Sequence, residues 1–364
     1  MDELGSQGAA LLYAPGQTER NAPGPAHLYA PGQAHVYREG GVGILGLGAY
    51  LPDRRLTNGE LEKIVETTDA WIVQRTGISE RRLISEGETT ASIAIKAAEA
   101  ALSNAGVAGG DIGLVIVATA SPDSYAPATA SLVQHAVGAK NCAAFDLNAG
   151  CSGALYGLTL AQSYIKSGAC GYALVVGAET ISRLVDWDDR KTCILFGDGA
   201  GAAVLGGTGS GYGFIASLLR SDGEDSGVIT IPALSISDED LERRKGVKKS
   251  TVWLDGSMVM KFASRAMSSA VLDVVNGAGL ELGDIDLIVP HQANIRIIEN
   301  ASKRLGLGGD KVFTNVSKYG NTSAASILIA LQEAAAEGRI KSGDNVVAVA
   351  FGAGLTYGAI LMRW

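Results

Sequence analysis

Gly110-Asp111-Ile112-Gly113-Leu114-Val115-Ile116 returns as Gly283-Asp284-Ile285-Asp286-Leu287-Ile288-Val289, 173 residues further on (283 minus 110). A second pair, Ile165-Lys166-Ser167-Gly168 and Ile340-Lys341-Ser342-Gly343, follows in the same order at a shift of 175 residues (340 minus 165). Two ordered matches at nearly the same offset predict an internal duplication, with a boundary near residues 206–213.

Short apolar runs alternate with longer segments of helical spacing along both halves of this duplication. Apolar runs of four to eight residues are typical of buried strands in α/β proteins. We therefore predict an α/β fold with strands near residues 114–118, 173–176, 287–289 and 346–351, and helices over residues 90–105 and 324–337.

The first 40 residues differ from the rest in composition. They hold four of the nine prolines and contain Leu-Tyr-Ala-Pro-Gly-Gln twice, at residues 12–17 and 28–33. Such a segment cannot bury enough apolar surface to fold alone. We predict a flexible Pro/Gly-rich extension over residues 1–40, an N-terminal half over 41–208 and a C-terminal half over 209–364.

Composition excludes several function classes. A net charge of −8 argues against general nucleic-acid binding, which needs a basic surface. The sequence has no apolar run of membrane-spanning length and no signal-peptide pattern. Its four cysteines show no C-x-x-C spacing, so we expect no disulfide scaffold, no metal site and a reducing, cytoplasmic location.

Cys151 stands between small residues in Asn148-Ala149-Gly150-Cys151-Ser152-Gly153-Ala154, at the start of a predicted helix. A helix N-terminus carries partial positive charge and unpaired N–H groups, which favour a thiolate over a thiol. Cys151 is therefore a candidate nucleophile. A buried structural cysteine is the alternative.

His291 and Asn321 occupy the second half, in segments that correspond to the Cys151 region. If the three residues converge at an interface between the halves, the imidazole activates the thiol and an acyl-cysteine forms. The N–H groups of Cys151 and of the turn at residues 351–354 then form an oxyanion hole, and His291 and Asn321 stabilise a second oxyanion such as an enolate. The alternatives are a strand-capping histidine and a turn or N-cap asparagine.

Two glycine-rich stretches, residues 43–48 and 197–201, superficially resemble nucleotide-binding loops. Neither has G-x-G-x-x-G spacing at the start of a helix with an acidic residue about 20 positions further on. We interpret both as glycines at close-packed backbone contacts. A nucleotide-dependent oxidoreductase is therefore disfavoured.

Together these motifs resemble the thiolase-fold condensing enzymes, specifically the β-ketoacyl-acyl carrier protein synthase III family. The resemblance covers residues 42–364 and depends on five strings: Asp69–Ile78, Asn148–Ala154, Phe196–Ala202, His291–Asn294 and Gly320–Ser326. It implies a thiolase-like duplication with α-β-α-β-α layers, a homodimer, and a decarboxylative condensation of acyl-CoA with malonyl-acyl carrier protein that initiates fatty acid biosynthesis.

The resemblance also implies residue roles. Cys151 accepts the acyl group, His291 and Asn321 assist decarboxylation, and Ala353 supplies the second oxyanion N–H. Coenzyme A enters as a thioester substrate, with no permanently bound cofactor. The residues implied for its binding are Trp71, Arg75, Thr76 and Arg190, with Ser257 and Asn294 along the pantetheine channel and Phe196 at the entrance. Without the resemblance, Trp71 and Arg75 indicate only a helix face with one core aromatic.

An acidic enzyme that receives an acidic carrier protein needs a local positive face. Arg296, Lys303 and Arg304 lie in a probable helix beside His291, and Lys261 is a further candidate. A charged helix face is otherwise simply solvated surface. We predict that these four residues dock the carrier protein.

Ala126 departs from the family pattern, because many members have phenylalanine at this position, contributed across the dimer to the acyl pocket. Loss of the benzyl group enlarges the pocket unless Tyr125 or another side chain fills it. We hypothesise a primer larger than acetyl, branched or of medium chain length.

Two rival functions remain from the sequence. One keeps the fold and changes the pathway: a starter-unit condensing enzyme of polyketide biosynthesis, or an acyltransferase. The other is a non-catalytic acyl-CoA-binding protein of the same fold, for which Cys151 is dispensable.

Overall fold

Two five-stranded sheets form the body of the protein in the computed structural model, which describes residues 33–37, 41–233, 237–243 and 250–364. The first sheet has the order β2 (Val42–Tyr50), β8 (Gly199–Gly207), β7 (Tyr172–Glu179), β5 (Ile112–Ala118) and β6 (Ala143–Leu147). The second has the order β1 (His35–Val36), β9 (Gly213–Ser221), β14 (Thr356–Arg363), β13 (Asn345–Gly352) and β12 (Leu287–Pro290).

Four strands of each sheet share one topology, and the fifth strands, β6 and β1, lie at opposite edges. In the first, β8 is antiparallel to β2 and β7, and β5 is parallel to β7. In the second, β14 is antiparallel to β9 and β13, and β12 is parallel to β13. This match confirms the internal duplication. The division between residues 208 and 209 falls between the end of β8 and the start of β9, and it stays a prediction.

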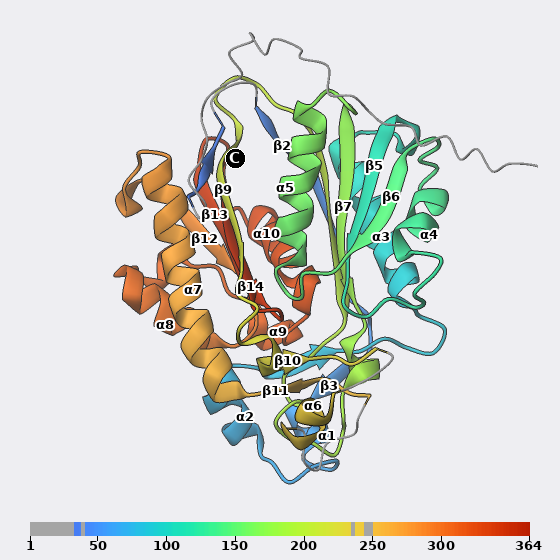
Figure 1. Cartoon of the computed structure of the whole chain (residues 1–364), viewed down its shortest axis with the longest axis vertical. Coiled ribbons are helices and arrows are strands. Elements are labelled where there is room, and N and C mark those ends of the chain that lie inside the picture. Colours follow the sequence, from blue (N-terminus) through green and yellow to red (C-terminus); the bar gives the residue numbers. More distant parts are fainter. Residues whose placement is uncertain (1–32, 38–40, 234–236, 244–249) are drawn as a thin grey trace, which may run out of the picture.

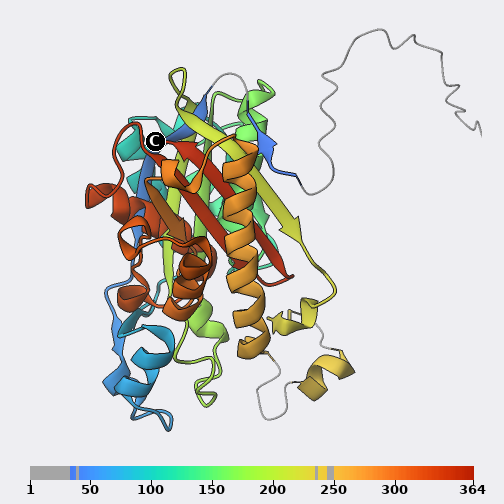
Figure 2. The same cartoon turned by 90° about the vertical axis from the view of Figure 1, so that its left-hand side faces the viewer.

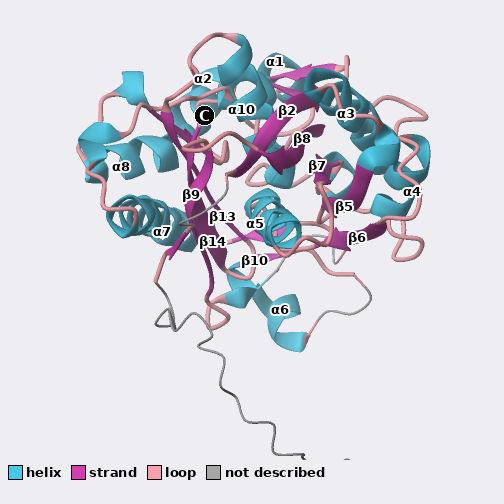
Figure 3. Ribbon diagram, turned by 90° about the horizontal axis from the view of Figure 1, so that it is seen from above, coloured by secondary structure: helices cyan, strands magenta, loops and turns pink. Residues whose placement is uncertain are grey.

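Helices cover both sheets and fill the space between them, which gives the expected α-β-α-β-α layers (Figures 1 and 3). Figure 2 shows α7 lying along the outer face of the second sheet. The outer helices are α3 (Thr90–Ala105) and α4 (Thr129–Ala136) on one side, and α7 (Gly256–Gly277) and α8 (Ile295–Leu305) on the other; α5 (Gly153–Lys166) and α10 (Ser326–Ala336) form the central layer.

The remaining elements are short. Two small sheets and several short helices lie in the lower half of the molecule in Figure 1. They are β3 (Arg55–Thr57) with β4 (Glu80–Arg82), β10 (Ile229–Thr230) with β11 (Trp253–Leu254), α1 (Asn58–Leu61), α2 (Asp69–Thr76), α6 (Asp238–Arg243) and α9 (Val316–Tyr319). The 3-10 turns are η1 (Gly109–Asp111), η2 (Ile181–Leu184), η3 (Ser226–Val228), η4 (Leu282–Asp284), η5 (Gly309–Lys311) and η6 (Ser323–Ala325).

The predicted helices and strands are present, with one change at the entry to α10. The sequence predicted a helix over residues 324–337, but the chain first makes the 3-10 turn η6 and becomes α-helical only at Ser326. Ser323 has a positive φ of 48°, which is uncommon for a residue other than glycine. The turn places the residues before α10 against the central cavity described below.

Glycines in both glycine-rich stretches stand at close backbone contacts, as predicted. A Cβ at Gly48 would collide with the backbone of Ala97 and Ala101 on α3, and one at Gly201 would collide with Leu328 on α10. These contacts let the helices approach the sheet closely. The stretches are packing surfaces rather than phosphate-binding loops.

The prediction of a flexible extension over residues 1–40 is wrong for His35 and Val36. These residues form β1, which pairs antiparallel with Ser217 and Ala216 on β9. The Tyr37 hydroxyl adds a 2.6 Å hydrogen bond to Ser217 Oγ. Edge-strand pairing satisfies backbone groups that a composition argument does not consider. The rest of the segment, residues 1–32 and 38–40, lies outside the described residues.

Within the part of the chain that the structure describes, no helix combines the length and apolar character needed to cross a bilayer.

Candidate active site

A cavity of about 780 Å³ lies where the parallel strands of both sheets end, and its lining includes Cys151, His291 and Asn321. The structure therefore brings together three candidates that lie far apart in the sequence. A second cavity of about 680 Å³ is bounded by residues of β2, β9 and the C-terminal strand, and no cysteine or histidine lines it. The chemistry consequently belongs to the first cavity.

Cys151 immediately precedes α5 in a turn that packs backbone to backbone on a turn of the other half. A Cβ at Gly352 would collide with the Cys151 nitrogen, and one at Gly150 would lie 2.6 Å from the Ala353 nitrogen. The hydroxyls of Ser152 and Thr356 are 2.7 Å apart and join the two turns. Glycine is required at both contacts because no side chain fits between the backbones.

Burial controls the ionisation of Cys151. The pKa of its thiol is raised to about 12, mainly by desolvation and to a smaller extent by the nearby Glu179, while a hydrogen bond with Ser323 opposes the shift. The expectation that the helix N-terminus favours a thiolate is therefore not met in the free protein. The resting group is a neutral thiol, because removal from water outweighs the helix-terminus field.

His291 follows β12 directly and is buried, with only 1% of its surface exposed. Its Nδ1 atom lies 2.6 Å from Ser326 Oγ, and its ring packs edge-on against Phe351 at 5.3 Å. Its Nε2 atom has no hydrogen-bond partner among the described residues. Burial lowers the pKa of the imidazole to about 3, so His291 is neutral.

The side-chain amide of Asn321 has a defined orientation. The backbone N–H of Ser323 donates to Asn321 Oδ1 at 2.8 Å, and only the oxygen can accept that bond. The Nδ2 group is therefore the free branch of the amide. Asn321 also makes an isolated parallel bridge with Phe196, which places both residues at the cavity wall.

The aromatic ring of Trp71 lies beside two guanidinium groups. Arg75 is 4.6 Å and Arg190 is 5.2 Å from the ring centroid. Thr76 differs from the expectation: it is 2% exposed, and its hydroxyl donates to Ile72 O and accepts from the Ile78 N–H. Thr76 therefore closes the end of α2 and is not available to a ligand in this structure.

The other predicted ligand contacts divide into cavity and surface residues. Asn294 and Phe196 line the cavity, and Asn294 Oδ1 also caps α8 by accepting the Arg296 N–H. Ser257 is exposed at the start of α7, beside the lining residues Gly256 and Val259, but it is not itself in the lining.

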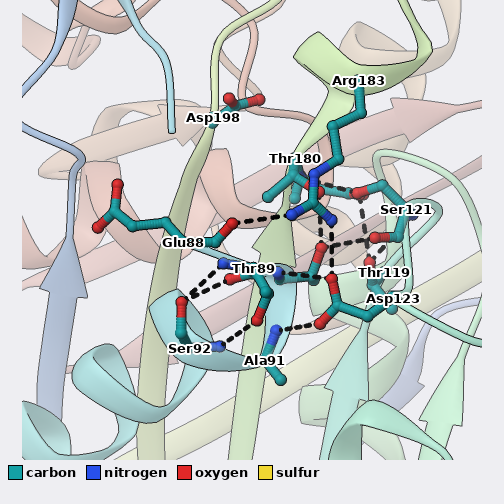
Figure 4. Close-up of polar contacts among 12 residues, drawn as sticks. Glu88, Thr89, Ala91, Ser92, Thr119, Ser121, Asp123, Thr180, Arg183 and Asp198 are labelled. Atoms are coloured by element: carbon teal, nitrogen blue, oxygen red, sulfur yellow. Dashed lines mark hydrogen bonds and ion pairs between the residues drawn. The ribbon is translucent and has the colours of Figure 1, made fainter. Parts of the chain in front are cut away.

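The loop that contains Ala126 is anchored at one end by charge. Asp123 makes a 2.8 Å ion pair with Arg183 and accepts the N–H groups of Thr90 and Ala91, as Figure 4 shows in part. Tyr125 lines the cavity, whereas Ala126 is exposed and does not line the cavity of its own chain.

The four predicted docking cations are exposed. Arg296, Lys303 and Arg304 lie on α8 and Lys261 on α7, and these two helices pack together. Arg296 Nε donates to Gln74 O on α2, which joins α8 to the helix that holds Trp71. The cations and the tryptophan thus lie on adjoining helices.

Three polar residues of the site were missed by the sequence reasoning: Glu179, Ser323 and Ser326. Ser323 contacts Cys151 and Glu179, and Ser326 contacts His291. The two serines lie in the quoted Gly320–Ser326 string, and Glu179 is a lone acid directly after an apolar strand. That position was a usable signal, because a carboxylate at the end of a buried strand needs several donors.

Two duplicated α/β halves in five layers, with a cysteine, a histidine and an asparagine in a shared cavity, define a condensing enzyme of the thiolase-like fold. The family described as 3-oxoacyl-[acyl-carrier-protein] synthase III matches residues 145–223, and its C-terminal part matches residues 275–364. The β-ketoacyl-[acyl-carrier-protein] synthase III of Symbiobacterium thermophilum is 50% identical over 327 residues, 89% of this chain and 98% of that protein. The chain belongs to the β-ketoacyl-[acyl-carrier-protein] synthase III family, whose members are acyltransferases.

Solved structures agree with this assignment. The β-ketoacyl-[acyl carrier protein] synthase III of Thermus thermophilus has a TM-score of 0.84 at 45% identity, covering 88% of this chain and 99% of that chain. The priming β-ketosynthase of the R1128 polyketide biosynthetic pathway has a TM-score of 0.82 at 33% identity, covering 90% and 98%.

The buried neutral His291 predicts acid sensitivity. Its pKa is about 3 in the folded protein against 6.5 ordinarily, so below about pH 6.5 the unfolded chain binds a proton that the folded protein does not. Stability should fall by roughly 2 kcal/mol between pH 7 and pH 5 from this group. We expect His291→Asn to flatten that loss in urea unfolding, and the matched exposed variant His135→Asn to retain it. An equal loss of unfolding free energy between pH 7 and pH 5 in His291→Asn and the parent would contradict the conclusion that His291 is buried and neutral.

Proposed function

We propose that this protein condenses an acyl-CoA primer with malonyl-acyl carrier protein, releasing CO2 and forming a β-ketoacyl-acyl carrier protein that initiates fatty acid synthesis. The observation that carries the proposal is the convergence of Cys151, His291 and Asn321 from the two halves on one largely apolar cavity. An apolar cavity with a few convergent polar groups suits an acyl chain whose reacting end needs polar contacts.

In the first half-reaction, Cys151 attacks the thioester carbonyl of acyl-CoA and coenzyme A leaves. The carbonyl oxygen gains negative charge as the sulfur adds. The backbone N–H groups of Cys151 and Ala353 belong to the two turns in contact, and we assign them to this oxyanion. Rigid backbone donors are effective here because they need no reorganisation during the reaction.

In the second half-reaction, malonyl-acyl carrier protein loses CO2 and the resulting carbanion attacks acyl-Cys151. The developing enolate oxygen is held by two donors, His291 Nε2–H and Asn321 Nδ2–H. The neutral imidazole donates at Nε2 when Nδ1 accepts the Ser326 hydroxyl, and the 2.6 Å contact supports that arrangement. Asn321 has its oxygen occupied by the Ser323 N–H, which leaves its NH2 group for the enolate.

Coenzyme A is assigned to the Trp71 side of the mouth. The indole face suits adenine, and Arg75 and Arg190 carry charge for the phosphates. The pantetheine arm then enters past Asn294 and Phe196. Ser257, exposed beside the cavity, is a second candidate contact for the arm. The geometry offers no support for Thr76.

We further propose a cytoplasmic homodimer. The strand β6 is the last in its sheet, and the side chain of Phe145 on it is exposed at 40%. An exposed apolar edge strand is a ready surface for pairing with a second copy, and a dimeric mass in sedimentation equilibrium would support it. All four cysteines are unpaired in the structure, and a thiol nucleophile requires a reducing compartment.

A polyketide starter-unit condensing enzyme is the second candidate. The likeness to the R1128 priming β-ketosynthase at 33% identity favours it, because the two proteins share the fold over most of their lengths. The chemistry at Cys151 is the same in both. Condensation assays with a fatty acid carrier protein and with a polyketide carrier protein distinguish the two candidates by which carrier is used more efficiently.

Cys151→Ala should abolish covalent labelling by radiolabelled acyl-CoA, because no other sulfur lines the described cavity wall except that of Met260. His291→Ala should retain labelling and lose condensation by at least about 100-fold, because it removes one oxyanion donor. Quenched-flow assays of labelling and of β-ketoacyl product measure the two steps separately. Labelling of Cys151→Ala would refute the mechanism, and so would full condensation by His291→Ala.

The Ala126 hypothesis predicts a primer larger than acetyl. Assays with acetyl-, isobutyryl- and hexanoyl-CoA at equal concentration should give the highest kcat/KM with one of the larger two. Ala126→Phe should lower that preference by roughly 10-fold or more, since a few buried methylenes each contribute about 1 kcal/mol. Tyr125→Phe, which keeps the ring, is the matched control. A strong preference of the parent for acetyl-CoA would contradict the hypothesis of a larger primer.

The docking proposal predicts a charge effect confined to the carrier-protein step. Lys303→Glu should raise KM for malonyl-acyl carrier protein several-fold at low salt, with the difference shrinking at high salt. The rate of labelling by acyl-CoA should stay unchanged. Lys341→Glu makes the same charge change at an exposed position outside the cavity lining and controls for net charge. An equal effect of both variants would remove the proposal.

A further inference from the structure

Glu179 is a buried acid that the mechanism above does not use. It ends β7 with no exposed surface, and none of the ion pairs in the described part of the chain involves it. Its carboxylate accepts hydrogen bonds from the hydroxyls of Thr119, Ser121 and Ser323 and from the Ala120 N–H. Burial raises the pKa of this carboxyl group, and the hydrogen bonds from these donors oppose that shift.

Ser323 connects this carboxylate to the nucleophile. Its Oγ lies 2.9 Å from Glu179 Oε1 and 3.4 Å from Cys151 Sγ. One hydroxyl has one proton, so it cannot donate to both. When Glu179 is the carboxylate, Ser323 donates to it, and the Ser323 oxygen faces the Cys151 thiol as an acceptor. The three groups thus form a continuous path for a proton.

The other titratable groups of the cavity are engaged elsewhere. Asp123 pairs with Arg183, and Asp146 accepts the N–H groups of Thr129 and Ala130 at the start of α4. Tyr125 is largely exposed on its loop. His291 Nε2 has no hydrogen-bond partner among the described residues, so it does not bond the thiol in the resting site. Ser323 is the side chain that contacts Cys151 Sγ.

We propose that Ser323 and Glu179 form a proton relay that deprotonates Cys151 during acylation, which leaves His291 neutral for the decarboxylation step. As Sγ bonds to the thioester carbon, its proton passes to Ser323 Oγ and the Ser323 proton passes to Glu179 Oε1. The carbon–sulfur bond to coenzyme A then breaks, and the departing thiolate takes the proton back along the same path. Glu179 ends as the carboxylate, and no proton remains on His291.

The relay rests on the proposed acylation of Cys151, and it assigns roles within that step. Ser323 touches the reacting sulfur, and Glu179 acts through Ser323 as a positioning residue and proton acceptor. Burial raises the pKa of Glu179. That direction suits a group that must accept a proton near neutral pH. The relay also explains why the Cys151 thiol, with a pKa raised to about 12, still reacts.

Single-turnover labelling by acyl-CoA and alkylation by iodoacetamide, both followed by mass of the Cys151 peptide from pH 6 to 10, test the relay. For the parent we expect rates that change little with pH in the neutral range. Ser323→Ala should react at least 10-fold more slowly at pH 7 and regain rate about 10-fold per pH unit, because only free thiolate then reacts. Glu179→Gln should show the same pH profile. The variant that combines both substitutions should react no more slowly than either single variant, because Ser323 and Glu179 act on the same proton path.

Ser268→Ala, which removes a buried hydroxyl bonded within α7, is the matched control and should keep the parent profile. Near-UV circular dichroism checks folding, and Ser323→Ala alone carries the test if Glu179→Gln does not fold. Unchanged profiles overturn the relay. So does faster labelling of Glu179→Gln, which would mean that the carboxylate only raises the thiol pKa. If acyl-CoA does not label the parent protein, the proposed function is refuted. The pH profiles of iodoacetamide alkylation would still test the relay in that case.

Discussion

The structure depends on one backbone contact between its two halves. The turn of Gly150 and Cys151 packs against the turn of Gly352 and Ala353 so closely that a single Cβ at either glycine would enter the opposite backbone. This contact places the cysteine and the histidine relative to each other. Cys151 lies in the first turn. His291 follows β12, and β12 pairs with β13, the strand that ends at Gly352 in the second turn. A duplicated fold becomes a composite site only because glycine permits this approach.

Removal of water from that contact controls the chemistry. Burial keeps the Cys151 thiol and the His291 imidazole neutral, in each case against the charged state that free side chains more readily adopt. Glu179 is buried as well, and backbone and hydroxyl donors replace water around its carboxyl group. His291 is buried and Cys151 is only partly exposed, so we expect proton movement within the site to follow short paths between hydrogen-bonded groups.

Much of the fold was predictable because its signals are local. The apolar runs of β5, β7, β12 and β13 and the helical spacing of α3 are visible in short windows of sequence, and the structure confirms them. The strand β1 was missed because its pairing with β9 is a distant contact. The hydroxyl of Thr76 satisfies its own helix end, a contact that the motif does not reveal, and its role in binding coenzyme A stays a prediction. Ser323 was missed because its contacts form only where β7 and η6 meet, whereas Glu179 was missed although its place at the end of an apolar strand was a usable signal.

The sequence by itself determined the duplication, the α/β class and the identities of Cys151, His291 and Asn321. Repeats and reactive side chains can be recognised in short segments of sequence without knowledge of distant contacts. Only the tertiary structure decided which of them are neutral, which way the Asn321 amide points and which hydroxyl faces the thiol. Ionisation depends on desolvation and on the charges nearby, and hydrogen-bond direction depends on the competing donors. Both properties belong to neighbours in space, and Ser323 lies 172 residues from Cys151 and 144 residues from Glu179 in the chain.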